Sequence, residues 1–123
     1  MTGERILVID DEEIICTLLK DTLTDAGYQV ETVTNGIEGL EKLLKGEPFD
    51  ILLTDIRMPK KDGIQVLKEA KNRVSDIITI IMTGYPSIET IREASEYNAF
   101  DYITKPLDPD EICECIKRSI EVR

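Results

Sequence analysis

Five short apolar runs alternate with five segments of helical period along the chain, and this alternation restricts the fold more than any other feature. The runs occupy residues 5–9, 29–33, 50–54, 77–82 and 100–104. Each run is brief enough for one strand, of which residues 29–33 (QVETV) alternate as in a more exposed strand, and each amphipathic segment that follows a run suits a helix. The pattern predicts an α/β fold, a doubly wound parallel sheet of five strands with helices on both faces and right-handed crossovers.

The helical segments carry their own start signals. Asn35, Ser87 and Asp108 stand where a side-chain oxygen caps the second, fourth and fifth segments, and Gly63 begins the third. No linker or low-complexity tract interrupts the pattern, and the repeats are too few for an eight-stranded barrel. We therefore predict one domain, residues 1–123.

Helical spacing also predicts which apolar side chains are buried. In the second helix, Ile37 and Leu44 are expected to point inward together with the leucines between them. In the fourth helix, Ile88, Ile91 and Ala94 follow the same spacing, and we interpret them as core contacts rather than as a stripe for a partner.

Charge and composition exclude several classes of function. The chain has 25 acidic and 15 basic side chains, a net charge of −10, which disfavours direct binding to nucleic acid or to an anionic membrane. It has no histidine, which excludes Ser-His-Asp or Cys-His catalysis and imidazole-ligated zinc within these residues. Three cysteines without CxxC spacing indicate reduced thiols. With no signal peptide or apolar span evident, we expect a soluble, cytoplasmic protein.

Polar residues follow four of the five predicted strands. Asp10 and Asp11 follow the first strand, Asp55 the third, Thr83 the fourth and Lys105 the fifth. Alone, each has a structural explanation, such as a helix cap for the acids or a solvated side chain for the lysine. Because the carboxyl ends of parallel strands meet at one edge of a sheet, we expect these residues to share a crevice.

Three converging carboxylates repel one another unless a cation lies between them. Hard oxygen ligands without histidine or thiolate favour Mg²⁺, which binds a few carboxylates and bridges to phosphate. A lysine and a hydroxyl at the same place suit the oxygens of a phosphoryl group. The chemistry predicted is phosphoryl transfer onto a carboxylate.

Four motifs, in order along the chain, carry a resemblance to a known family. They are Asp10-Asp11, residues 53–59 (LTDIRMP) with Asp62-Gly63, Met82-Thr83-Gly84, and residues 102–106 (YITKP). In order and spacing the chain resembles the receiver domain of two-component response regulators, and residues 82–90 are most similar to receivers of the nitrogen-regulatory, σ54-activator type. The resemblance implies a flavodoxin-like strand order 2-1-3-4-5.

The resemblance also implies a role for each residue at the crevice. Asp55 resembles the phosphoacceptor. Asp11 and Asp55 resemble the direct side-chain ligands of Mg²⁺, the backbone carbonyl of Arg57 completes the protein ligands, and Asp10 acts through water. Lys105 resembles the lysine that pairs with the acceptor and then with the phosphoryl oxygens.

A second group resembles the family's switch. Thr83 resembles the hydroxyl that is drawn toward the phosphoryl group, and Tyr102 resembles the aromatic residue that changes rotamer with it, although alone it is also typical of a half-buried strand. The Lys105-Pro106 bond is expected to be cis. Pro59 is interpreted as a turn residue.

The implied reaction is a relay between proteins. A sensor histidine kinase or a histidine phosphotransfer protein is expected to supply the phosphoryl group, because this chain has no histidine of its own. The readout face is expected at the fourth helix, fifth strand and fifth helix, about residues 87–118, toward an effector domain for transcription or a second copy of the chain. We expect a signalling domain that promotes its own aspartyl phosphorylation and slow dephosphorylation, rather than a conventional enzyme.

Two alternatives stay open. One is a receiver-like module that signals without phosphorylation. The other is a Mg²⁺-dependent phosphatase with an aspartyl intermediate, which needs a second acid two residues after Asp55, where this chain has Arg57. Arg57 and Tyr85, two residues beyond Asp55 and Thr83, are expected to hinder attacking water and slow the hydrolysis.

Overall fold

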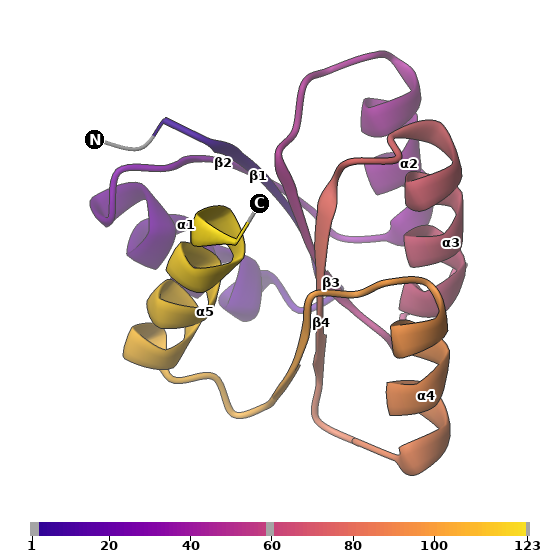
Figure 1. The fold of residues 1–123 in the computed structure, drawn as a ribbon. Helices are drawn as coiled ribbons and strands as arrows, with labels where there is room; N and C mark the ends of the chain where they lie inside the picture. The colour runs from indigo at the N-terminus through magenta and orange to yellow at the C-terminus, as the bar shows by residue number, and fades with distance from the viewer. Residues whose placement is uncertain (1–2, 59–60, 123) are drawn as a thin grey trace.

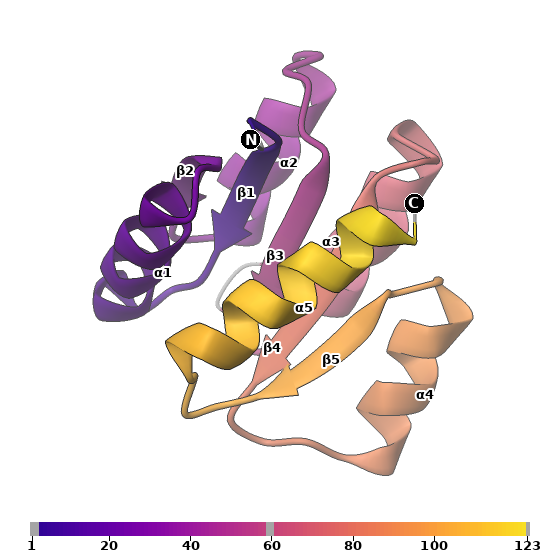
Figure 2. The ribbon, with the colours of Figure 1, turned by 60° about the vertical axis from the view of Figure 1, so that its left-hand side comes forward.

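One parallel sheet of five strands forms the centre of the molecule. The computed structural model describes residues 3–58 and 61–122, so the turn expected at Pro59 lies outside the described residues. The strand order is β2-β1-β3-β4-β5, which confirms the predicted α/β class and topology (Figures 1 and 2). The strands are β1 (Arg5–Ile9), β2 (Gln29–Val33), β3 (Ile51–Asp55), β4 (Ile78–Thr83) and β5 (Asp101–Thr104).

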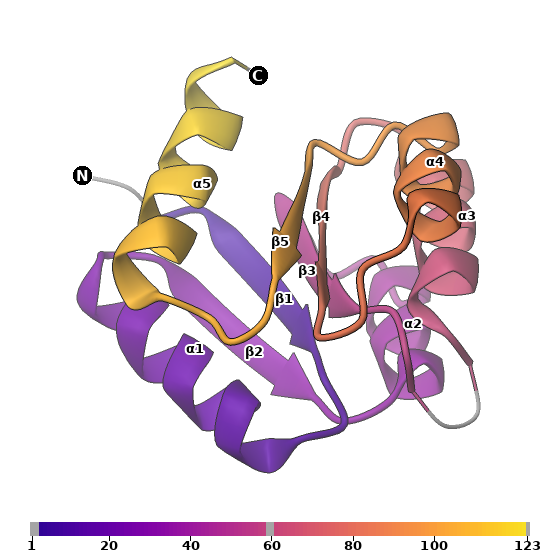
Figure 3. The same ribbon diagram turned by 90° about the horizontal axis from the view of Figure 1, so that it is seen from below.

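Helices cover both faces of the sheet. Helices α1 and α5 lie on one side, and α2, α3 and α4 lie on the other (Figure 3). Within the described residues, no helix is long and apolar enough to span a bilayer. The helices are α1 (Glu13–Asp25), α2 (Gly36–Leu44), α3 (Gly63–Arg73), α4 (Ile88–Glu96) and α5 (Pro109–Glu121).

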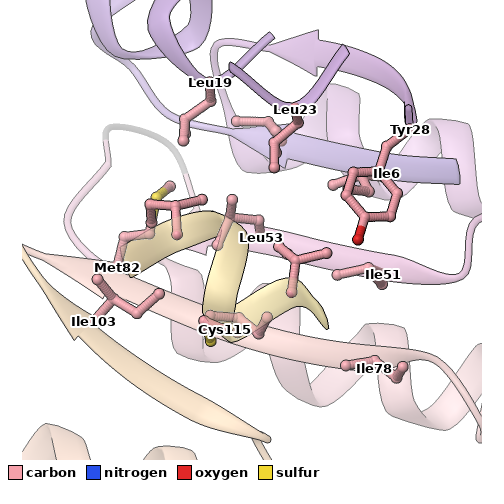
Figure 4. Packing of buried hydrophobic residues seen from close by; sticks show 14 residues of the cluster. Ile6, Leu19, Leu23, Tyr28, Ile51, Leu53, Ile78, Met82, Ile103 and Cys115 are labelled. Atoms are coloured by element: carbon pink, nitrogen blue, oxygen red, sulfur yellow. The ribbon is translucent and has the colours of Figure 1, made fainter. Parts of the chain in front are cut away.

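The strands are held in place by apolar packing on both faces. β3 and β4 are buried along their whole length, which explains why their sequences are almost continuously apolar. On the side of α1 and α5, Ile6, Leu53 and Met82 of the sheet pack with Leu19 and Cys115 (Figure 4). A second cluster lies on the opposite face against α2 and α3. The packed sheet therefore gives a rigid support to whatever its carboxyl edge carries.

Side-chain caps begin most of the helices. As predicted, Asn35, Ser87 and Asp108 accept hydrogen bonds from backbone N–H groups at the starts of α2, α4 and α5. Sequence reasoning named Asp62 as part of a motif but did not identify it as a cap, and it caps α3 in a reciprocal capping box with Gln65. These caps determine the residue at which each of these helices begins.

The prediction that helical spacing buries four isoleucine and leucine side chains was wrong. Ile37 and Leu44 of α2 are 43% and 53% exposed, and Ile88 and Ile91 of α4 are 75% and 46% exposed. Ala94 is the residue of α4 that packs in the core. The neighbouring edge strand β5 is short, so only a narrow stripe of the α4 surface is covered. The apolar stripe of a helix thus indicates which side faces the rest of the protein. It does not indicate how much of the helix surface is covered.

Gly63, the first residue of α3, lies directly against the end of β3. Its N–H donates to the carbonyl oxygen of Ile56 over 2.8 Å. A Cβ at this position would overlap the carbonyl oxygen of Asp55 and lie 2.8 Å from the Cα of Ile56. Only glycine allows α3 to begin this close to the residue that the sequence singles out as phosphoacceptor.

We predict that Gly63→Ala lowers the free energy of unfolding by about 2 kcal/mol, because the new methyl group forces two backbone segments apart. Gly84→Ala is the matched control, since a Cβ there would meet Lys105 at an ordinary 3.8 Å. Urea unfolding followed by circular dichroism measures both variants. Equal unfolding midpoints for the two variants would contradict the close approach.

Candidate functional site

The fold gathers the predicted polar residues at the carboxyl edge of the sheet. Asp10 directly follows β1, Asp55 and Thr83 end β3 and β4, and Lys105 directly follows β5. Carboxylate oxygens of Asp10, Asp11 and Asp55 all lie within 4.8 Å of one another. The prediction that the three aspartates converge is therefore confirmed.

Lys105 is the cation that faces this cluster. Its Nζ lies 2.8 Å from Asp10 Oδ2, 3.1 Å from Asp55 Oδ2 and 3.4 Å from Glu12 Oε1. The backbone N–H of Lys105 donates to the carbonyl oxygen of Thr83 over 2.7 Å, and the peptide bond to Pro106 is cis, as expected. One side chain thus contacts acids from two different strand ends and from the start of α1.

Glu12 belongs to the site but was missed by sequence reasoning. It directly precedes α1, and its carboxylate reaches Lys105 without capping the helix. Its backbone N–H donates to Asp10 Oδ1 over 2.9 Å. The run of acids after the first strand was the available signal, but a third acid there is equally typical of an exposed helix start.

Burial makes the charges at this site energetically expensive. Asp10 is fully buried, and desolvation raises the pKa of its carboxyl although Lys105 and the Glu12 N–H favour the ionised form. For Lys105, burial opposes the charge, but the hydrogen bonds and charges of Asp10 and Asp55 outweigh it and raise the lysine pKa above its ordinary value. The lysine therefore stays protonated and holds the two acids in place.

Asp55 is held from two sides. It is almost fully buried, and its Oδ1 accepts a hydrogen bond of 2.8 Å from the N–H of Ile56. Its Oδ2 accepts from Lys105. A carboxylate fixed in this way has its orientation set before any reaction partner arrives, as a nucleophile in a confined site requires.

The two residues predicted to act as a switch use their hydroxyls elsewhere in this structure. Thr83 is buried, and its Oγ1 accepts from the N–H of Tyr85 over 3.0 Å. The hydroxyl of Tyr102 lies 2.8 Å from Oγ1 of Thr90 in α4. Thr83 follows Met82, which pairs with Asp55 in the neighbouring strand, while the hydroxyl of Tyr102 is directed toward α4.

A cleft of about 210 Å³ opens above Asp55. Its lining combines the acids and the lysine with residues of the loops after β3 and β4, namely Asp11, Glu12, Asp55, Arg57, Gly84, Tyr85 and Lys105. The guanidinium carbon of Arg57 lies 5.0 Å from the centroid of the Tyr85 ring, a cation–π contact. The two side chains that were predicted to hinder water thus meet at the wall of the cleft.

The donor set suits a hard divalent cation. Asp10, Asp11 and Asp55 offer carboxylate oxygens close together, and with Glu12 they exceed the positive charge of Lys105 by three. Mg²⁺ binds through a few carboxylates and keeps several waters, which an open cleft of this size allows. The residues present therefore fit Mg²⁺, and the ligand role expected for the carbonyl of Arg57 stays a prediction.

We predict that Lys105→Met lowers the free energy of unfolding by about 3 kcal/mol at pH 8 in EDTA, because it leaves buried carboxylates without their cation. The loss should shrink as the pH falls. An acid whose pKa is raised in the folded state binds more protons there than when unfolded, so the penalty at Asp10 disappears as the pH falls from above its folded pKa toward the ordinary 3.8.

Urea unfolding over a pH series measures this difference against the unchanged protein. Lys61→Met is the matched control, since Lys61 pairs with Glu69 at the surface and should matter by about 1 kcal/mol or less, without this pH dependence. A Lys105→Met penalty that grows on acidification would contradict the account of the site.

Comparisons with known proteins agree with this geometry. The chain matches the family model of the response regulator receiver domain over residues 6–117. It is 45% identical over 114 residues to the transcriptional regulatory protein ZraR of Klebsiella oxytoca, covering 91% of this chain and 26% of that relative. The chain thus spans about a quarter of the length of that relative.

Two further similarities extend over nearly complete chains. The sporulation initiation phosphotransferase F of Bacillus subtilis is 36% identical over 123 residues, which is 100% of this chain and 98% of the relative. The crystal structure of a CheY-like receiver domain from Methanospirillum hungatei has a TM-score of 0.93 at 33% identity, covering 98% of this chain and 95% of that one. Because the family match runs from β1 into α5, this chain belongs to the receiver domains of two-component response regulators.

Proposed function

We propose that Asp55 accepts a phosphoryl group from a phosphohistidine of a sensor histidine kinase or a histidine phosphotransfer protein. The observation that carries the proposal is the position of Asp55, oriented by Ile56 and Lys105 beneath a cleft that Asp11 also lines. Asp11, Asp55 and the backbone carbonyl of Arg57 would hold Mg²⁺ directly, and Asp10 would act through a water molecule. When bound, the ion would supply positive charge that offsets the charge of the transferring group.

The carboxylate of Asp55 acts as the nucleophile. One of its oxygens forms the new bond to phosphorus while the bond from phosphorus to the imidazole nitrogen of the donor breaks, and the leaving nitrogen keeps the electron pair. Lys105 already contacts Oδ2 of Asp55, so its ammonium is placed to pair with phosphoryl oxygens once that carboxylate has reacted. Positioning and charge compensation supply the catalysis.

Phosphorylation then biases a two-state surface. The new oxygens attract the hydroxyl of Thr83, which must leave the N–H of Tyr85 to reach them. Tyr102 follows, and the face formed by α4, β5 and α5, about residues 87–118, changes its contacts with an effector domain or a second copy. In line with the transcriptional regulator among its relatives, we propose that the domain controls transcription in the cytoplasm without binding nucleic acid itself.

The two alternative functions that the sequence left open receive less support. A module that signals without phosphorylation has no need for the acid cluster, whose buried charges cost stability. A phosphatase with an aspartyl intermediate needs a general acid where Arg57 contacts the Tyr85 ring.

We predict that the protein, incubated with Mg²⁺ and acetyl phosphate, gains the mass of one phosphoryl group, measured by intact-protein mass spectrometry. Asp55→Asn should abolish the gain because an amide is not a nucleophile here. Asp62→Asn is the matched control, since asparagine caps a helix as well as aspartate does, and this acid lies outside the cleft lining. A gain that persists in Asp55→Asn, or no gain in the unchanged protein, would overturn the assignment.

We also predict that the phosphoryl group is long-lived because the Arg57–Tyr85 contact narrows the approach of water to Asp55. After removal of acetyl phosphate, Tyr85→Ala should lose its phosphoryl mass several times faster than the unchanged protein. Tyr85→Phe keeps the ring and should decay at the original rate. If Tyr85→Ala decays at the original rate, the contact does not control hydrolysis.

A further inference from the structure

The hydroxyl of Tyr102 is hydrogen-bonded to the first turn of α4. It lies 2.8 Å from Oγ1 of Thr90, and the pair is partly buried. The Tyr102 ring packs against the cluster that contains Ile81 and Ala94, so both its ends are engaged. The sequence gives no signal for this pair, because the two residues come from different elements.

Thr90 also holds the start of α4 together. Its Oγ1 accepts from the N–H of Ser87 at 3.3 Å and lies 3.1 Å from the carbonyl oxygen of Ser87, as one half of the capping box. A threonine hydroxyl has one proton and two lone pairs. Ser87 Oγ also lies 2.9 Å from this oxygen, so the Thr90 proton goes either to that hydroxyl or to the Ser87 carbonyl. In both cases a lone pair of Thr90 Oγ1 can accept the proton of Tyr102. A single oxygen therefore joins the helix cap to the tyrosine.

Strand register relates this oxygen to the phosphorylation site. Tyr102 of β5 pairs with Ile81 of β4, and Thr83 lies two residues further along β4. Side chains two residues apart on a strand point to the same face, so Thr83 and Tyr102 are diagonal neighbours on the side of α4. A displacement of Thr83 toward Asp55 would therefore move it away from its diagonal neighbour Tyr102.

We propose that Thr90 is a positioning residue that holds Tyr102 in the resting arrangement and ties its release to the first turn of α4. The inference rests on the proposed function and adds to it the contact that opposes the switch. Tyr102 leaves Thr90 when it moves toward the space vacated by Thr83, and the loss of this contact alters the capping of α4. The exposed apolar side chains Ile88 and Ile91 on that helix then shift with it.

Coupling of this kind is reciprocal. A hydrogen bond present only in the resting arrangement weakens the binding of any phosphoryl mimic by the same factor by which the mimic weakens the bond. Removing a contact worth one net hydrogen bond should therefore tighten the binding of beryllium fluoride with Mg²⁺ about fivefold.

The binding test uses Thr90→Val, Thr90→Ser, Tyr102→Phe and the double variant Thr90→Val/Tyr102→Phe, with beryllium fluoride titrated at constant Mg²⁺. We expect about fivefold tighter binding for Thr90→Val and unchanged binding for Thr90→Ser, which keeps the hydroxyl. In the Tyr102→Phe background, Thr90→Val should add nothing, because the bond is already absent.

Ser87→Ala separates the tyrosine contact from helix capping, since it removes the other half of the capping box and leaves Thr90 and Tyr102 in place. It should change the binding of beryllium fluoride much less than Thr90→Val does, because the hydrogen bond to Tyr102 is retained. A Ser87→Ala effect equal to that of Thr90→Val, or a Thr90→Val effect that persists without the tyrosine hydroxyl, overturns the inference. If the unchanged protein itself fails to bind the mimic, the proposed function fails.

A second measurement tests the contact without any ligand. The chain has four tyrosines and no tryptophan, so labelling with 3-fluorotyrosine gives few ¹⁹F resonances, and Tyr102→Phe identifies the one from residue 102. Thr90→Val should shift that resonance and Thr90→Ser should restore it. If the chemical shift of the Tyr102 resonance is unchanged in Thr90→Val, the inference is overturned, whatever the affinities for beryllium fluoride are.

Discussion

The structure depends on one electrostatic constraint, the concentration of carboxylates at the carboxyl edge of a parallel sheet around a single lysine. Lys105 contacts Asp10, Asp55 and Glu12, and Asp11 stands beside them. Buried charge of one sign costs stability, and the raised pKa of Asp10 expresses that cost. An excess of carboxylate charge suits a divalent cation. Under the proposed function, that cation in turn offsets the negative charge of the transferring phosphoryl group.

The rest of the fold holds this edge in place and connects it to α4. The two-sided apolar core fixes the strand ends, and Gly63 lets α3 begin against the backbone of Asp55. Two neighbouring strands connect the site to α4. Thr83 lies at the end of β4, and Tyr102 of β5 is hydrogen-bonded to Thr90 of α4. The acid-lined cleft and the surface of α4 are thus linked through only two neighbouring strands.

Much of this was predictable from the sequence, because the period of apolar residues determines strands and helices, and strand ends in a parallel sheet converge. That reasoning placed Asp10, Asp55 and Lys105 together. It failed for Ile88, because the burial of this side chain depends on how much of the surface of α4 is covered. It also failed for Thr90, because its hydrogen-bond partner Tyr102 comes from another element. Glu12 shows the same limit, since helix-start acids and site acids look alike in sequence.

The central claim, that Asp55 is the phosphoacceptor, is tested most directly by locating the modified residue. Borohydride reduces an aspartyl phosphate to homoserine, and the tryptic peptide spanning residues 46–57 contains both Asp50 and Asp55. After incubation with Mg²⁺ and acetyl phosphate, we expect fragment-ion mass spectrometry to show homoserine at position 55 and unchanged aspartate at position 50. Homoserine at position 50 or at any other acid, with residue 55 unmodified, would contradict the account.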